Sequence, residues 1–162
     1  MAILDDLHMR FKLKYFENGK PEVCEGVLRS LPDWFGIEKS TQTYINISKE
    51  LPMIVAYHND EAVGFLSIKI HSEHSGEIYV MGVASRIHRQ GVGKLLLEEA
   101  ECRLKGEGVE FIQVKTVDSS RESDFYKKTR LFYQSLGFKK LEVFPTLWGE
   151  HNPCLLLVKS LK

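Results

Sequence analysis

The sequence predicts a single mixed α/β domain that spans residues 1–162. Three observations lead to this prediction. Short segments rich in β-branched and aromatic residues alternate with segments of helical periodicity. A length of 162 residues suits one domain with a core of its own. No repeat, low-complexity segment or linker divides the chain, and its hydrophobic content of 43% and charged content of 27% are ordinary for a globular protein.

The first half of the chain is expected to contain a strand, two helices and two further strands. Loose alternation of apolar and polar residues predicts the first strand, and proline and glycine between the two helices break the helical pattern. Asn59-Asp60 between the last two strands favours a tight antiparallel turn. The predicted elements are His8–Phe16, Pro21–Ser30, Ser40–Glu50, Met53–His58 and Ala62–His71.

The second half is expected to alternate strands with two helices and to end in two strands. The first of these helices has an apolar face formed by Val92, Leu96, Ala100 and Leu104. Glycines follow both helices, Gly106 and Gly137, and are the predicted C-caps. The predicted elements are Gly76–Ala84, Gln90–Lys105, Phe111–Val117, Asp124–Leu136, Phe138–Phe144 and Cys154–Lys159.

The most informative segment is the loop that joins a predicted strand ending near Val83 to the helix that follows. It contains three cationic residues, Arg86, Arg89 and Lys94, and two glycines, Gly91 and Gly93. Glycine lets the backbone approach a ligand closely, and the first N–H groups of a helix are unpaired at the positive end of its dipole. The segment therefore predicts a cradle for the phosphates of a ligand.

Two common phosphate-binding motifs do not fit this segment. A P-loop requires G-x-x-x-x-G-K-[ST], but Lys94 is followed by Leu95 and lies too close to Gly91. A dinucleotide-binding fingerprint requires a third glycine where Leu96 stands. The local pattern also allows a helix N-terminus without any ligand, so a second motif is needed to decide.

That second motif is Tyr133 followed four residues later by Gly137-Phe138. Together with His88-Arg89-Gln90-Gly91-Val92-Gly93, in the place of a [Q/R]-x-x-G-x-[G/A] motif, it resembles the GNAT superfamily of acetyl-CoA-dependent N-acetyltransferases. The resemblance covers residues 50–145 well. It implies a mostly antiparallel, twisted sheet of about seven strands, flanked by about four helices and splayed between the fourth and fifth strands.

The resemblance also implies which residues hold acetyl-CoA. Backbone N–H groups near Met81 and Val83 are expected at the thioester carbonyl, and those of the helix start at the pyrophosphate. The expected cofactor-binding residues are Met81, Val83, His88, Arg89, Gln90, Gly91, Val92, Gly93, Lys94 and Tyr126. Two of them depart from the family pattern, because His88 replaces Gln or Arg and Tyr126 replaces an Asn that contacts the pantetheine arm.

Two residues are the candidates for proton transfer. Tyr133 is the candidate general acid, because a phenol with an ordinary pKa of about 10 keeps its proton at neutral pH. Glu77 is the candidate base, acting through water or by holding the cation. Glu150 and His151 are the alternatives, in a loop that borders the acceptor site in this family. A packed core tyrosine and a solvent-facing strand glutamate are the structural alternatives.

Composition and sequence pattern limit the kinds of partner, metal and cellular compartment that are expected. A net charge of zero gives no case for nucleic-acid binding, and no apolar run could span a bilayer. The first residues lack the pattern of a secretion signal and the three cysteines lie far apart, so a cytoplasmic protein without disulfides is expected. No metal is expected, because His71-Ser72-Glu73-His74 offers no third ligand. The family resemblance alone implies a homodimer.

The predicted function is transfer of an acetyl group from acetyl-CoA to a primary amine by direct attack in a ternary complex. The acceptor is a small molecule or a protein, and the acidic stretch from Asn59 to Glu77 favours a small cationic amine. Two alternatives stay open. One is a CoA-binding sensor or interaction module without turnover, and the other is a nucleotide-binding protein unrelated to CoA.

Overall fold

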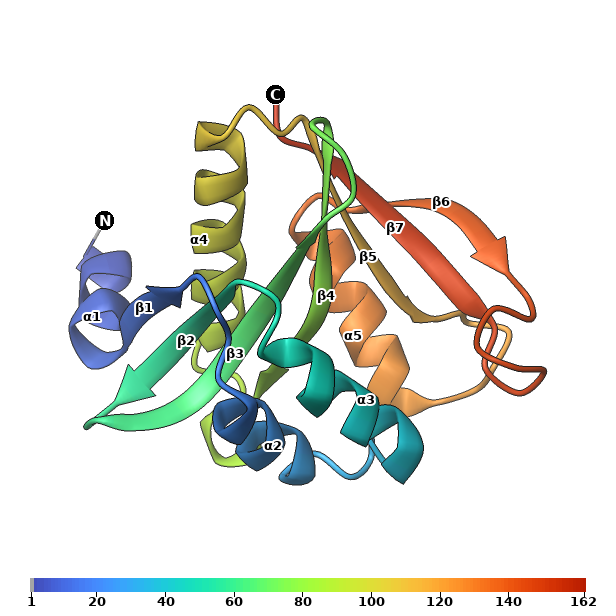
Figure 1. Ribbon diagram of the computed structural model, residues 1–162, viewed down its shortest axis with the longest axis horizontal. Helices are drawn as coiled ribbons and strands as arrows, with labels where there is room; N and C mark the ends of the chain where they lie inside the picture. The colour runs from blue at the N-terminus through green and yellow to red at the C-terminus, as the bar shows by residue number, and fades with distance from the viewer. Residues whose placement is uncertain (1) are drawn as a thin grey trace. The chain divides into compact units, whose positions relative to one another are not determined.

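A computed structural model describes the backbone of residues 2–162 and the side chains of residues 6–162. Its strands are paired in the order β1-β2-β3-β4-β5-β7-β6, in a mixed sheet of seven strands (Figure 1). The strands are β1 (Lys12–Phe16), β2 (Met53–His58), β3 (Glu61–Ile70), β4 (Ser75–Val83), β5 (Phe111–Val117), β6 (Lys139–Phe144) and β7 (Cys154–Ser160). The helices are α1 (Ala2–Arg10), α2 (Pro21–Arg29), α3 (Glu38–Ser48), α4 (Val92–Gly106) and α5 (Asp124–Ser135), with a 3-10 turn at Ser85–Ile87.

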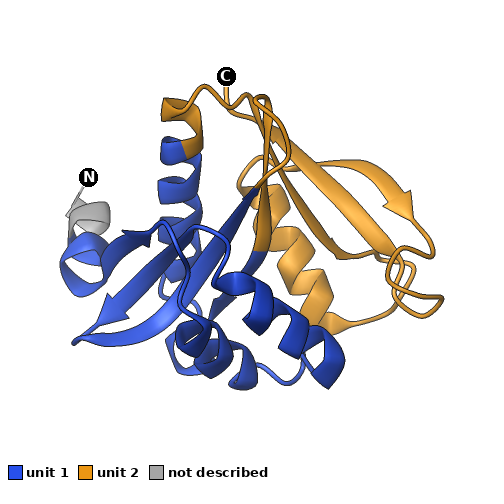
Figure 2. Cartoon of the chain, viewed as in Figure 1, with its two compact units in different colours: residues 1–69, 80–103 blue, residues 70–79, 104–162 orange. Residues whose placement is uncertain are grey.

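The chain forms two compact units (Figure 2). Unit 1 comprises residues 1–69 and 80–103, and unit 2 comprises residues 70–79 and 104–162. Strand β4 and helix α4 each pass from one unit into the other. The mixed fold class is therefore confirmed, and the described residues form five α-helices where about four were expected.

Unit 1 is built on the antiparallel strands β1, β2 and β3. Consecutive residues of β2 from Met53 to Ala56, and of β3 from Val63 to Ile68, are all buried. Side chains of neighbouring strand residues point to opposite faces, so both faces of these strands are covered. Positive φ angles of 50° and 64° at Asn59 and Asp60 confirm the predicted tight turn between β2 and β3.

Unit 2 has one covered and one open sheet face. Strands β4 and β5 are parallel from Ser75–Ile78 and Phe111–Val114, and β5 pairs antiparallel with β7. Along β5, Ile112 and Val114 are buried, whereas the alternate residue Phe111 is 44% exposed. The buried face carries the core of unit 2, and the opposite face is partly exposed.

Two sequence predictions about local structure are corrected. The predicted strand His8–Phe16 begins only at Lys12, because His8–Arg10 form the last turn of α1, where basic residues complement the helix dipole. The predicted cap Gly106 is the last residue of α4, and Gly108 with a φ of 83° adopts the left-handed conformation instead. The other predicted cap, Gly137, is confirmed by its φ of 97° and by a bond from the Phe138 N–H to the Tyr133 carbonyl.

Candidate functional site

The phosphate cradle, residues Val83–Lys94, lies within unit 1 and has the predicted backbone form. The chain leaves β4, makes a 3-10 turn and enters α4 at Val92. Gly91 has a φ of 87°, a left-handed conformation that glycine adopts without strain. The Leu95 N–H bonds the Gly91 carbonyl at 3.1 Å, so the N–H groups that precede it in α4 have no acceptor inside the helix. These free donors are the part of the cradle that suits an anion.

Only part of the predicted positive charge of the cradle is available to a ligand. Arg86 is paired with Glu61 at 2.7 Å, and Lys94 lies 3.9 Å from Glu98 one turn along the helix. Arg89 is exposed, with a φ of 64°, and forms no ion pair among the described residues. Arg89 is therefore the cation of the loop that a ligand can neutralise at the lowest cost.

His88, the first departure from the family motif, serves the loop itself. Its Nε2 atom lies 2.6 Å from the carbonyl oxygen of Val83, and because a carbonyl oxygen can only accept, Nε2 carries a proton and donates this bond. The Trp34 ring meets the His88 ring edge-on, with centroids 5.7 Å apart. The side chain thus closes the cradle onto the end of β4 and onto the segment after α2.

Helix α1 packs against the cradle, which the sequence did not indicate. The Arg10 guanidinium donates to the Gln90 side-chain oxygen at 2.7 Å. A Cβ on Gly91 would lie 3.1 Å from a methyl carbon of Leu7. Gly91 is therefore held by its backbone conformation and by this contact together, and no larger residue fits without a shift.

The other predicted cofactor residues of unit 1 lie at the end of β4 and at the start of α4. Met81 and Val83 are half-buried at the end of β4. The next residue, Ala84, donates its N–H to the Val63 carbonyl at 2.8 Å and fixes where the strand ends. Val92 is 1% exposed and anchors the first turn of α4 in the core, while Gly93 beside it is half-buried.

In unit 2, Tyr133 is buried on α5 with a free hydroxyl group. Its side chain is 5% exposed and packs edge-on against Phe132 and Phe138, with ring centroids 5.1 and 5.4 Å away. Among the described residues the hydroxyl has no hydrogen-bond partner. Burial raises the pKa of Tyr133 well above the ordinary value of a phenol, because the anion would be poorly solvated. Tyr133 therefore remains a proton donor throughout the physiological pH range.

Helix α5 is anchored at two points. Ser123 caps it by accepting the Tyr126 N–H at 3.4 Å. Further along, the buried Arg130 donates to the Val117 carbonyl at the end of β5, at 2.7 Å. Arg130 was not among the predicted residues, and it fixes the helix that carries Tyr133. The second departure, Tyr126, is half-buried, which raises the pKa of its phenol even though the nearby Arg121 lowers it.

Glu77 is buried in a three-residue cluster with His71 and Lys115, called the Glu77 cluster below. The Glu77 side chain is 6% exposed. One carboxylate oxygen lies 2.7 Å from His71 Nε2, and the other accepts from the Lys115 ammonium at 2.8 Å. A buried carboxylate needs such partners, because an unpaired charge would lose its hydration. Glu77 is thus neither the solvent-facing residue of the structural alternative nor a free carboxylate.

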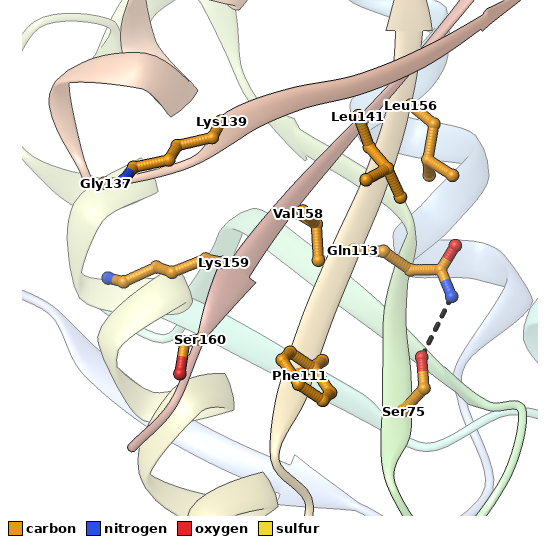
Figure 3. A pocket seen from close by; sticks show the side chains of 10 residues that line it. All are labelled: Ser75, Phe111, Gln113, Gly137, Lys139, Leu141, Leu156, Val158, Lys159 and Ser160. Carbon is orange, nitrogen blue, oxygen red and sulfur yellow. Dashed lines mark hydrogen bonds between the residues drawn. The ribbon is translucent and has the colours of Figure 1, made fainter.

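Beside this cluster, the open sheet face of unit 2 carries a groove of about 660 Å³. Figure 3 shows its apolar residues and, at the β4 edge, the bond from the Gln113 amide to Ser75 at 3.0 Å. Glu77 pairs with Gln113 in the register of β4 and β5, so the cluster continues this row of polar side chains. The apolar lining residues are Phe111, Leu141, Leu156 and Val158.

The alternative base candidates, Glu150 and His151, stay predictions. Glu150 and His151 are exposed in the loop between β6 and β7. His74 pairs with Glu73 and Glu110, at 3.4 and 3.3 Å. Within the described residues, no three histidine, cysteine or acidic side chains gather as metal ligands would.

Among residues 2–162, no helix combines the length and the apolar character that crossing a membrane requires.

Fold and site together define a mixed α/β domain that presents free N–H groups at a helix N-terminus and a buried tyrosine on a second helix. A family model described as an acetyltransferase (GNAT) domain matches residues 49–140, which is more than half of the chain. The chain therefore belongs to the GNAT acetyltransferase family, as the two motifs predicted.

Individual relatives agree with this assignment. An uncharacterized N-acetyltransferase of Chlorobaculum tepidum is 28% identical over 103 residues, which are 62% of this chain and 59% of the relative. The match thus spans about three fifths of the relative's length. A solved structure from Desulfovibrio desulfuricans, described as a member of the GNAT family, has a TM-score of 0.81 at 15% identity and covers 94% of this chain and 99% of its own.

A further structure contains the ligand that the motifs predicted. A GNAT family acetyltransferase from Elizabethkingia anophelis was solved with acetyl-CoA bound. Its TM-score is 0.73 at 17% identity, over 93% of this chain and 98% of its own. At this identity the likeness establishes the shared fold.

Proposed function

We propose that this protein is an N-acetyltransferase that transfers the acetyl group of acetyl-CoA to a primary amine. The observation that carries the proposal is the row of free N–H groups at the start of α4, directly after Gly91 in its left-handed conformation. Family membership, the N-acetyltransferase relative and the acetyl-CoA in one structural neighbour support it.

The residues of the cradle fit the phosphates of this ligand. Backbone N–H groups at a helix N-terminus bind pyrophosphate without a metal. Arg89 adds an unpaired charge, and His88 keeps the loop closed by its bond to Val83. The free hydroxyl of Tyr133 also fits, because a hydroxyl without a protein partner can donate a hydrogen bond when a ligand supplies the acceptor. Acetyl-CoA would supply an acyl carbon that is activated as a thioester.

Each proposed step uses a named group of the chain. A base takes one proton from the acceptor ammonium, and we assign this step to the Glu77 cluster. The amine nitrogen then forms the new bond to the acyl carbon while the carbon–sulfur bond breaks, and the nitrogen loses its second proton to solvent. Tyr133 gives its proton to the leaving sulfur and regains one from solvent. The products are an amide, a free thiol and one released proton, and N–H groups near Met81 and Val83 stabilise the carbonyl oxygen.

We expect this function to be visible as thiol release from acetyl-CoA in the presence of amines. The assay follows free thiol with a chromogenic disulfide, over a panel that contains a polyamine, an amino acid, an aminoglycoside and a peptide with a free N-terminus. At least one acceptor should give saturable release far above the rate without enzyme, and the small cationic amines should rank first. Binding of acetyl-CoA without release by any acceptor would instead identify a sensor module.

A further inference from the structure

We infer that His71 is the residue that takes the proton from the acceptor amine, and that Glu77 and Lys115 position it. The inference rests on the proposed function and identifies the base of that reaction. It changes the sequence-based prediction in one respect, because Glu77 would act through His71. The observation behind it is the geometry of the Glu77 cluster, in which the turn after β3, strand β4 and strand β5 bring an imidazole, a carboxylate and an ammonium together.

Accessibility separates the roles of the two groups. The Glu77 side chain is 6% exposed, and both of its oxygens are bonded within the protein. The His71 side chain is 34% exposed, and its partner Glu77 pairs in register with Gln113, which lines the groove. A proton acceptor must come within hydrogen-bond reach of the amine. Of the two, the imidazole is the group that an acceptor can reach.

The bond to Glu77 selects the tautomer that a base needs. A carboxylate accepts hydrogen bonds, so His71 Nε2, at 2.7 Å from Glu77, carries the proton. The other ring nitrogen, Nδ1, is then the free lone pair, and it has no hydrogen-bond partner among the described residues. This is the arrangement in which a buried carboxylate orients an imidazole and stabilises the cation that forms when the imidazole takes a proton.

Lys115 supplies the positive charge of the cluster. Its ammonium donates to the second oxygen of Glu77 at 2.8 Å and balances the buried charge. The carboxylate therefore has a counter-ion in the ammonium and does not depend on the imidazole for charge balance. The backbone holds the ring in place, because the His71 N–H bonds the Ser75 carbonyl at 2.9 Å across the turn between β3 and β4.

Other titratable groups near the cluster lie on three strands. Tyr79, two residues after Glu77 in β4, has its pKa raised by burial and by the Glu77 charge. On β7, burial raises the pKa of Cys154 to about 11, so this thiol stays neutral. On β3, Lys69 lies two residues before His71 in the chain. The charged groups bonded to His71, directly or through one neighbour, are therefore Glu77 and Lys115.

The first test is the pH dependence of acetyl transfer by His71→Ala, with His74→Ala as the matched control. Both variants remove an imidazole from the same turn, but among the described residues His74 pairs with Glu73 and Glu110 and takes no part in the Glu77 cluster. We expect His71→Ala to lower kcat/KM by roughly a hundredfold or more and to abolish the fall in rate toward acidic pH. Added imidazole should restore part of the activity, and protection by acetyl-CoA should be unchanged. A His71→Ala enzyme as active as His74→Ala would overturn the assignment and leave the transferase function intact.

Lys115→Met distinguishes positioning from a merely structural role. Without the ammonium, the unbalanced Glu77 carboxylate favours the protonated imidazole, so the acidic fall in rate should move to higher pH. The Glu77→Gln variant should move it to lower pH and reduce the maximal rate, because the amide cannot stabilise the imidazolium as the carboxylate does. Profiles that stay superimposable on that of the wild type would contradict the positioning roles.

A second readout needs no turnover. Long-range proton–nitrogen NMR at pH 8, with the His71 signals identified by their loss in His71→Gln, reports which ring nitrogen carries the proton. We expect the proton on Nε2 and an unprotonated Nδ1, with this preference weakened in Glu77→Gln. A proton on Nδ1 would overturn the inference whatever the acceptor. Failure of wild-type protein to bind acetyl-CoA would instead refute the proposed function, so the two failures are distinguishable.

Discussion

Replacing Gly91 by alanine is expected to weaken binding of acetyl-CoA roughly tenfold to hundredfold. An L-residue at its φ of 87° costs about 1–2 kcal/mol, and the new methyl group would press on Leu7 at 3.1 Å. Relief by rotating the backbone would turn the neighbouring N–H groups away from the ligand. The loss of one hydrogen bond to a charged group, about 1.5–3 kcal/mol, corresponds to that range of affinity. Isothermal titration with CoA measures it.

The matched control is Gly108→Ala. Gly108 has nearly the same φ, 83°, and a Cβ there meets no atom within 4 Å. It follows α4, whereas Gly91 precedes it. Both substitutions are expected to lower Tm, by roughly 2–8 °C for 1–2 kcal/mol. Only Gly91→Ala is expected to weaken CoA binding, and an equal loss of affinity in the two variants would mean that the cradle does not hold the ligand.

Removing the hydroxyl of Tyr133 is expected to lower kcat by about 10²–10⁴-fold and to leave cofactor affinity nearly unchanged. In Tyr133→Phe the leaving sulfur loses its proton donor, whereas the ring packing against Phe132 and Phe138 remains. No hydrogen bond to a described residue is lost, so Tm should not fall. Steady-state kinetics with the best acceptor, together with CoA titration, measure the two effects separately.

The pH dependence of the rate is a second test of the acid role of Tyr133. Burial raises the folded-state pKa of Tyr133 above its unfolded value, so the phenol keeps its proton, and the stability that depends on it, until the pH rises past the ordinary value of about 10. The wild-type rate should therefore show no loss from Tyr133 between pH 8 and 9. Tyr57→Phe removes a phenol hydroxyl from β2 in unit 1 and serves as the control. A kcat for Tyr133→Phe equal to that of Tyr57→Phe would exclude the acid role.

The parts of the molecule that the sequence predicted are those encoded locally. Glycine at Gly91 and Gly137 marks positive φ, and Asn59-Asp60 marks a tight turn, because few other residues adopt these conformations. The strands after the first follow from local enrichment in β-branched and aromatic residues, and the two helices of the second half follow from helical periodicity. These local signals were sufficient for the mixed α/β class and for the backbone of the cradle, whereas the seven-stranded sheet was predicted from the family resemblance.

The features that the sequence did not reveal depend on contacts between distant segments. Lys115 reaches Glu77 across 38 residues of chain, and the bond from His71 to Glu77 appears only once the turn between β3 and β4 has formed. His71 was therefore considered only as a poor metal ligand. His88 was identified as a departure from the family motif, but its bond to Val83 requires the folded loop. Charge counts also missed that Arg86 is already paired with Glu61.

The most direct test of the central claim is thermal unfolding in the presence of acetyl-CoA, CoA, ATP and NAD at matched concentrations. A ligand at 100 times its Kd adds about 2.7 kcal/mol to the free energy of unfolding, or on the order of 5–10 °C in Tm for a domain of this size. We predict such a shift with acetyl-CoA and CoA, a much smaller one with ATP or NAD, and its loss in Gly91→Ala beyond that variant's own lower Tm. Equal protection by ATP, or none by CoA, would contradict the assignment of the cradle.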